Sequence, residues 1–226
     1  MLALIAVAFF LLIVALPQLL VRRTIARHSK DRPDLPGTGA ELARHLLDHF
    51  DLRHVAVEPT EQGDHYDPST NAVRLSGGHH DGRSISAVAI AAHEVAHAIQ
   101  HHRGERMFAL RGRLAVAAHV ADKAAGVFFL AAPVLGLLAR TPIAFFGLVA
   151  IGVLLLAVRV VVDLVTLPLE TDASFGKALP ILKTGGYVDE RDMPAARSVL
   201  RAAAFTYVAG ALMSLVNLAR WVRLLR

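Results

Sequence analysis

Two histidines and a glutamate lie within five consecutive residues, His93-Glu94-Val95-Ala96-His97, and the residues on either side favour a helix. Histidines four residues apart project from the same face of a helix. Two neutral imidazoles about one turn apart can occupy two corners of a zinc tetrahedron. Glu94 is placed to take a proton from a metal-bound water. This stretch therefore predicts a Zn²⁺ site with hydrolytic chemistry.

A catalytic zinc site needs three protein ligands and an open position. The chain has no cysteine, and the position six residues after the motif, where a third histidine could stand, is Arg103. A carboxylate from elsewhere should then complete the site, and we expect this ligand to be Glu170, with Asp172 as the rival. Residues two apart on a regular helix face different ways. The acid that does not bind the metal could accept a hydrogen bond from a histidine Nδ1–H.

These ligands predict a mechanism. Zinc lowers the pKa of its bound water, Glu94 takes the proton, and the hydroxide attacks a peptide carbonyl. Glu94 then returns the proton to the leaving amine. The oxyanion also needs a donor. Four side chains that the sequence does not rank could supply it or contact the substrate: Tyr66, Arg74, His101 and Tyr187.

Two helices should position the motif. Apolar residues at helical spacing predict a helix over residues 39–50, with Thr38 as its N-cap and Glu41 completing a capping box. The helix that carries the motif should begin at Ser84 or Ser86. The apolar residues ahead of the motif predict that this second helix is buried, which would hold the metal ligands rigidly.

A short β-hairpin is expected before the motif. Residues His54–Glu58 alternate as a strand does, Asp67–Asn71 has the composition of a turn, and Ala72–Leu75 could be the returning strand. The open edge of a strand near Val73 could pair with an extended substrate backbone. The alternative is a structural hairpin packed on the helix, and one strand could do both.

The composition predicts an integral membrane protein. Apolar residues make up 54% of the 226 residues, and the formal net charge is +5. This apolar fraction is high for an ordinary soluble domain. The basic residues cluster beside apolar runs, so we expect anionic membrane lipid, and not nucleic acid, as their partner.

Four apolar runs could cross a membrane. Residues 2–21 match the roughly 20 residues that a bilayer requires, and we interpret them as a retained anchor and not a cleaved signal peptide. Residues 124–139 and 143–158 could form a transmembrane hairpin, or a re-entrant one because each run is short. Residues 202–218 could cross the membrane or lie along it. The basic residues after residue 21 place the next segment in the cytoplasm.

The predicted fold is mainly α, with three to four transmembrane helices and a small zincin-like cytoplasmic portion that contains the short β-hairpin. The segments are 1–21, an N-terminal transmembrane anchor; 22–123, the cytoplasmic zincin-like catalytic portion; 124–165, a transmembrane helical hairpin; 166–201, a cytoplasmic segment with the third zinc ligand; and 202–219, a C-terminal transmembrane or membrane-associated helix.

One set of motifs spans nearly the whole chain: Asp64–Pro68, Val73–Ser76, Gly82–Ser84, Ala91–Val95 and Leu167–Ser174. In order and spacing they resemble the YugP-like family of bacterial membrane-bound neutral zinc metallopeptidases. The resemblance implies a prokaryotic multi-pass plasma-membrane protein whose active site faces the cytoplasm, and it supports Glu170 as the third zinc ligand. It also implies kinship with gluzincins, in which an acid usually follows the ligand glutamate by four positions. Here that position is Ser174, and the nearby acid is Asp172.

Our main hypothesis is a membrane-embedded zinc endopeptidase that cleaves membrane or membrane-adjacent proteins, with Glu94 as general base. The alternative is a non-catalytic membrane scaffold or regulator with a structural zinc site. Glu94 favours the enzyme, because a structural site needs no base beside its ligands. The substrate would be a protein or peptide.

Overall fold

The computed structural model describes residues 16–138 and 141–224, apart from some side chains of the long helices. Residues 16–27 are helical. The further helices are α2 (Gly39–His49), α3 (Gly77–His80), α4 (Ile85–His102), α5 (Arg106–Leu138), α6 (Pro142–Thr171), the π-helix η1 (Asp172–Ala178), α7 (Leu179–Thr184) and α8 (Met193–Leu224). The described ranges also contain three short strands, so the prediction of a mainly α fold with a small sheet is confirmed.

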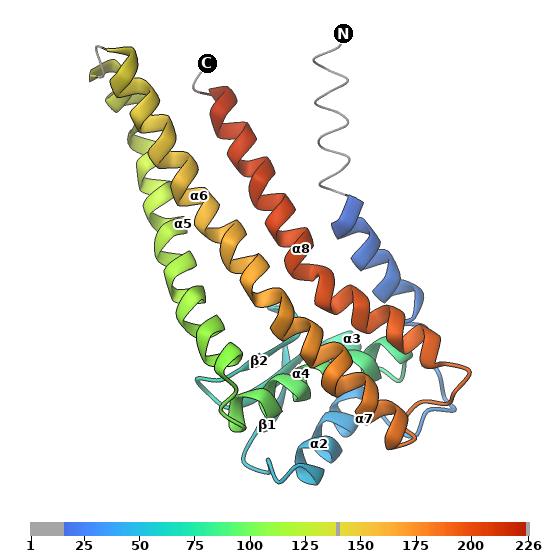
Figure 1. Ribbon diagram of the computed structural model, residues 1–226. Coiled ribbons are helices and arrows are strands. Elements are labelled where there is room, and N and C mark those ends of the chain that lie inside the picture. Colours follow the sequence, from blue (N-terminus) through green and yellow to red (C-terminus); the bar gives the residue numbers. More distant parts are fainter. Residues whose placement is uncertain (1–15, 139–140, 225–226) are drawn as a thin grey trace. The chain divides into compact units, whose positions relative to one another are not determined.

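The contacts within the chain define two compact units. One comprises Leu19–Ala109 and Leu167–Thr206, and it contains the sheet and α4. The other contains Leu110–Thr166 and the chain's outer ends, from residue 18 and from residue 207 outward. In the first unit, α2 and α3 gather with the sheet around α4 (Figure 1).

Helix α4 is the centre of the first unit's core. Every residue from Ile85 to Gln100 is buried, which confirms the predicted burial of the motif helix. Of the two predicted start positions, Ser84 is the N-cap: its side chain accepts a hydrogen bond from the Ala87 amide at 3.1 Å. Ser86 lies inside the helix and donates its hydroxyl to the Ile25 carbonyl at 2.7 Å.

Helix α2 begins with the capping box predicted from the sequence. The Glu41 amide donates to Thr38 Oγ1 at 3.2 Å, and the Thr38 amide donates to Glu41 Oε2 at 2.8 Å. Two backbone amides that have no partner within the helix are thereby satisfied. The apolar face of α2 packs on α4 through Ala43, Leu46 and Leu47.

The sheet contains β1 (Ala56–Thr60), β2 (His65–Asp67) and β3 (Ala72–Ser76) in the order β1-β3-β2. The predicted hairpin between residues 54–58 and 72–75 is wrong, because β1 pairs with β3 in parallel. The hairpin that forms at the predicted turn joins β3 to β2, with Tyr66 opposite Val73. Strand β3 is therefore central, and the expected open edge near Val73 is wrong because both of its edges are paired. Alternation of apolar residues marks a strand but does not distinguish a central strand from an edge strand.

Helix α6 contains Pro168 within its length. It continues to Thr171 and then widens into the π-helix η1. A π-helical segment changes the angular spacing of successive side chains, and such segments are frequent at functional sites. The transition stands between Glu170 and Ser174, two residues of the candidate site.

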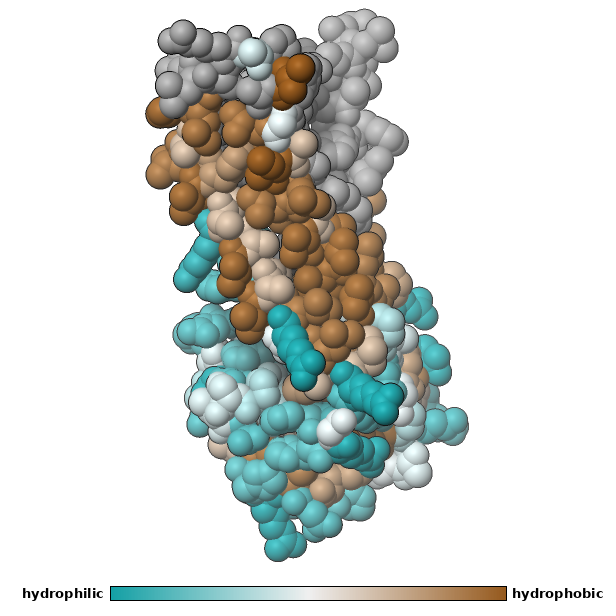
Figure 2. Space-filling model, turned by 60° about the vertical axis from the view of Figure 1, so that its left-hand side comes forward, coloured by the Kyte–Doolittle hydropathy of each residue, from teal (hydrophilic) through white to brown (hydrophobic). Residues whose placement is uncertain are grey.

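The second unit exposes large apolar side chains on its long helices (Figure 2), among them Val116, Val127, Leu130, Ile143 and Leu154. Within the described ranges, nevertheless, no helix combines the length and the apolarity needed to cross a membrane. The prediction of three to four transmembrane helices is therefore wrong, and the multi-pass plasma-membrane location is corrected with it.

The physical reason lies in the lengths of the apolar runs. The runs over residues 124–139 and 143–158 each have sixteen residues, fewer than the roughly 20 that a bilayer core requires. The helices that contain them also carry charged residues such as Asp122 and Arg159. Most of the predicted anchor over 1–21 lies outside the described residues.

Asp64 ties β2 to the end of β3 and to α3. Its Oδ1 accepts hydrogen bonds from the Ser76 amide at 2.7 Å and from Ser76 Oγ at 2.9 Å, and its Oδ2 lies 2.7 Å from His79 Nδ1. Burial alone would raise the pKa of Asp64, but the contacts with His79 and Ser76 outweigh it and hold this pKa below its usual value.

We expect Asp64→Asn to destabilise the protein by about 1–3 kcal/mol near neutral pH, because hydrogen bonds to a charged group are lost. Since the folded pKa of Asp64 lies below its unfolded value, the carboxylate stabilises the fold above an unfolded pKa of about 3.9. That contribution disappears as the pH falls through the folded pKa. Urea unfolding at a series of pH values should show the difference between the two proteins shrinking below about pH 4.

Asp81→Asn is the matched control. Asp81 also contacts a histidine, with Oδ1 2.6 Å from His80 Nδ1, but its side chain is 79% exposed. Asp81→Asn should lower the free energy of unfolding much less than Asp64→Asn does, because exposed ion pairs contribute little to stability. A difference for Asp64→Asn that stays constant down to acid unfolding would contradict the prediction.

Candidate metal centre

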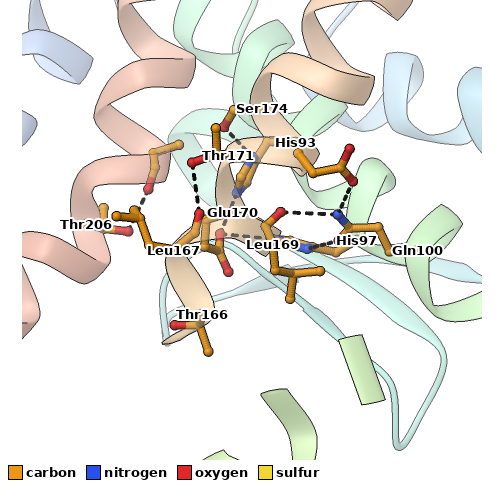
Figure 3. A network of polar contacts seen from close by, with 12 residues as sticks. His93, His97, Gln100, Thr166, Leu167, Leu169, Glu170, Thr171, Ser174 and Thr206 are labelled. Atoms are coloured by element: carbon orange, nitrogen blue, oxygen red, sulfur yellow. Dashed lines mark hydrogen bonds and ion pairs between the residues drawn. The ribbon is translucent and has the colours of Figure 1, made fainter. Parts of the chain in front are cut away.

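Helix α4 and the end of α6 bring two histidines and a glutamate together. His93, His97 and Glu170 each offer a ligand atom, and these atoms all lie within 4.8 Å of one another. Glu170 Oε2 is 3.4 Å from His93 Nε2 and 3.2 Å from His97 Nε2 (Figure 3). All three side chains are buried, with at most 5% of each exposed.

Local structure explains this meeting of distant residues. His93 and His97 stand one turn apart on α4, so their rings share a face, with centroids 4.7 Å apart. Glu170 lies near the C-terminal end of α6, directly after the buried Leu169. The next element, η1, packs on α4. The apolar contacts of Leu169 and Ala173 hold the carboxylate against the histidine face.

The Nδ1 atom of His93 faces a serine. Ser174 Oγ lies 3.1 Å from His93 Nδ1 and donates its own proton to the Leu200 carbonyl in α8 at 3.0 Å. With its proton used in that bond, the serine oxygen can only accept at His93 Nδ1. His93 therefore carries its proton on Nδ1, and its Nε2 presents a lone pair towards Glu170.

The Nδ1 atom of His97 faces Gln100, whose Oε1 lies 2.8 Å away. The Gln100 amide nitrogen in turn donates to the Leu169 carbonyl at 3.2 Å and to Asp172 Oδ2 at 2.8 Å. Both histidines thus have a hydrogen-bonding partner on the ring nitrogen that points away from Glu170. Partners of this kind orient the imidazoles that bind metals.

The structure does not bring Asp172, the rival ligand, into the cluster. Its carboxylate accepts from Gln100 and pairs with Lys177, which also contacts Glu105 Oε1 at 3.0 Å. Burial alone would raise the pKa of Asp172, but the hydrogen bonds from Lys177 and Gln100 outweigh it and lower the pKa. Nor does Asp172 contact a histidine Nδ1 directly, because Gln100 and Ser174 take those two positions.

Glu94, the predicted general base, follows His93 directly on α4 and is only 6% exposed. Among the four predicted oxyanion or substrate contacts, His101 lies on α4 itself, and Tyr66 lies on β2, which packs against α4. Tyr66 Oη is 2.8 Å from His101 Nδ1 and donates to Asn71 Oδ1 at 3.1 Å. Burial and the charge of nearby Asp67 raise the pKa of Tyr66 to about 12, so its hydroxyl stays protonated.

Phe108 connects these side chains to the cluster. Its ring centroid lies 5.2 Å from that of His101, 6.2 Å from that of Tyr66 and 6.3 Å from that of His97. Tyr66 and His101 therefore share an aromatic neighbour with His97, one of the three clustered residues.

The other two predicted contacts lie elsewhere. Arg74 binds Glu58 at 3.0 Å and Asp67 at 2.6 Å within the sheet. Tyr187 Oη lies 2.9 Å from His45 Nε2 at α2. The structure does not bring either side chain to the cluster, because each is held by polar partners on another element.

Gln100 was not among the residues predicted from the sequence, and Ser174 was predicted without a partner. Helical spacing contains the signal for both. Gln100 stands three residues after His97, and Ser174 stands four residues after Glu170. Residues at these separations share a helix face, so each points to the same side as the neighbouring ligand candidate.

Comparisons with known proteins give the family of this chain. Residues 3–226 match the model of a family described as "putative neutral zinc metallopeptidase". The chain is 38% identical over 207 residues to the "putative membrane protease YugP" of Bacillus subtilis (strain 168), which covers 91% of this chain and 88% of that protein. No solved structure matches the chain. The resemblance drawn from the sequence motifs is thereby confirmed.

Family membership assigns zinc as the cofactor, and the buried group of His93, His97 and Glu170 could bind it. The family match covers nearly the whole chain, and the aligned region covers most of the relative. The chain therefore belongs to this bacterial family of zinc metallopeptidases, which hydrolyse peptide bonds.

Proposed function

We propose that the protein is an endopeptidase whose zinc is held by His93, His97 and Glu170 and whose general base is Glu94. The observation that carries the proposal is the convergence of both histidine Nε2 atoms on Glu170 Oε2, at 3.4 and 3.2 Å. Two imidazoles and one carboxylate are a donor set of catalytic zinc sites, which keep a further position open.

The chemistry of these donors fits a divalent cation. Each imidazole has its Nδ1 directed at a hydrogen-bonding partner, so each Nε2 presents a lone pair, and Glu170 adds a carboxylate oxygen. Buried electron-rich atoms that face one another favour a cation among them. When bound, zinc lowers the pKa of a water and polarises the substrate carbonyl.

Glu94 is the residue of this chain that we assign to proton transfer. It neighbours His93 on α4 and is buried. Its carboxylate would accept the proton of the attacking water and deliver it to the leaving nitrogen as the peptide bond breaks. The donors for the oxyanion would be His101 and the Tyr66 hydroxyl, which stays protonated and would turn its proton from Asn71 to the substrate.

We propose membrane-adjacent proteins as the substrates and lipid as a partner. The relative in Bacillus subtilis is named as a membrane protease. The second unit of this chain also exposes large apolar side chains along α5 and α6, including Val116, Leu130 and Leu154. Exposed apolar patches of this kind serve as contact surfaces for proteins or membranes.

The metal ligands can be tested by comparing Glu170→Ala with Asp172→Ala. We expect Glu170→Ala to lose its zinc, because the removed carboxylate is one of three ligands. Asp172→Ala should retain zinc at saturating metal, because Asp172 lies outside the cluster. Metal analysis after gel filtration gives the answer. If Asp172→Ala loses zinc and Glu170→Ala keeps it, our ligand assignment is wrong.

The general base can be tested with Glu94→Gln, which keeps the size of the side chain and removes its basicity. We expect peptide hydrolysis to fall about 100-fold to 10,000-fold, the usual contribution of a positioned general base, while bound zinc stays at the wild-type level. Glu61→Gln, at an exposed position, is the control and should cleave normally. Wild-type cleavage by Glu94→Gln would overturn the mechanism.

A further inference from the structure

We propose that Gln100 is a positioning residue that holds the proton of His97 on Nδ1 and directs its Nε2 lone pair towards the metal, and that Asp172 sets the orientation of the Gln100 amide. The inference rests on the proposed zinc-binding role of His97. It adds a function for two polar side chains that bind no metal themselves.

The first step concerns which way the Gln100 amide points. Gln100 is fully buried, and one end of its amide lies 3.2 Å from the Leu169 carbonyl oxygen and 2.8 Å from Asp172 Oδ2. A carbonyl oxygen and a carboxylate can only accept hydrogen bonds. The NH₂ group must therefore occupy this end, because an amide oxygen there would face two acceptors.

The second step concerns the proton of His97. With the NH₂ group facing Asp172, the Gln100 oxygen must face His97, and it lies 2.8 Å from Nδ1. An amide oxygen is only an acceptor, so His97 Nδ1 must be the donor. A neutral imidazole has one ring proton, and Nε2 is then left with the lone pair that a metal needs.

The third step concerns what holds Asp172. Lys177 pairs with Asp172 and with Glu105 Oε1, the latter at 3.0 Å, and only 12% of the Lys177 side chain is exposed. Glu105 follows α4, whereas Asp172 and Lys177 belong to η1. The ion pairs therefore connect η1 to the residue that follows α4, close to the hydrogen bond between Asp172 and the Gln100 amide.

The fourth step separates His97 from His93. Ser174 and the Leu200 carbonyl orient His93 without any contact with Gln100. Loss of the Gln100 amide should consequently disturb one zinc ligand and leave the other in place. This predicts a selective effect, which general damage to the core would not produce.

The first experiment replaces Gln100 with methionine, which has a similar shape but offers neither the amide donor nor its acceptor. We expect the zinc dissociation constant of Gln100→Met to rise about 10-fold to 100-fold, as measured by titrating the zinc-loaded protein with a chelator. The control is Gln62→Met at an exposed position, which should bind zinc like the wild type.

The second experiment observes His97 directly. The full-length protein is labelled with ¹⁵N-histidine and loaded with ¹¹³Cd, whose coupling identifies the ligand nitrogens. We expect the Nδ1 proton resonance of one ligand histidine to shift upfield in Gln100→Met because its strong acceptor is lost, while the other ligand histidine is unchanged. Equal shifts in both histidines, or in neither, would overturn the proposal.

The third experiment exchanges the amide of Gln100 and the carboxylate of Asp172 between the two positions. Gln100→Glu places a carboxylate against Asp172 and should weaken zinc binding. Adding Asp172→Asn to this variant supplies an amide donor to the new carboxylate, which can still accept from His97, so zinc affinity should recover in part. Recovery is partial because the Leu169 carbonyl loses its donor. A double variant that binds zinc no better than Gln100→Glu contradicts the role of Asp172.

The outcomes also distinguish this inference from the proposed function. Normal zinc binding and an unchanged His97 resonance in Gln100→Met, in a protein that still cleaves peptides, would overturn the role of Gln100 alone. If the Gln100 variants lose zinc affinity as expected but the wild-type protein cleaves no peptide, the role of Gln100 would be supported and the endopeptidase contradicted.

Discussion

Helix α4 is buried from Ile85 to Gln100, so each polar side chain on this stretch needs a partner inside the protein. Leaving such groups unpaired in an apolar interior is costly. The histidine face of α4 meets this requirement through residues that follow about seventy positions later, at the end of α6 and in η1. The same contacts that satisfy the buried groups also aim both Nε2 atoms at Glu170.

These contacts come from both sides of the change from α-helix to π-helix. Glu170 belongs to the last turn of α6, and Ser174 and Asp172 belong to η1. Within five residues, this segment presents a carboxylate to both histidines, a hydroxyl to His93 and a second carboxylate to Gln100. The site therefore depends on one short segment packed against one helix, and a shift of that segment would disturb all of these contacts.

Ser174 orients His93 although it carries no carboxylate. The serine still reaches His93 Nδ1, because its hydroxyl proton is used by the Leu200 carbonyl and its oxygen remains an acceptor. A hydroxyl in this setting can orient an imidazole without adding a charge.

The motif, the capped helix at Thr38, the burial of α4 and the turn before β3 could be predicted from the sequence, because they depend on residue spacing and on neighbours along the chain. The position of Glu170 between the histidines, the contact of Asp172 with Gln100 and the central place of β3 came from the folded structure. These facts depend on how distant segments pack, which local periodicity does not encode. The predicted membrane spans were wrong because apolar runs indicate burial from water, but their length must also match a bilayer.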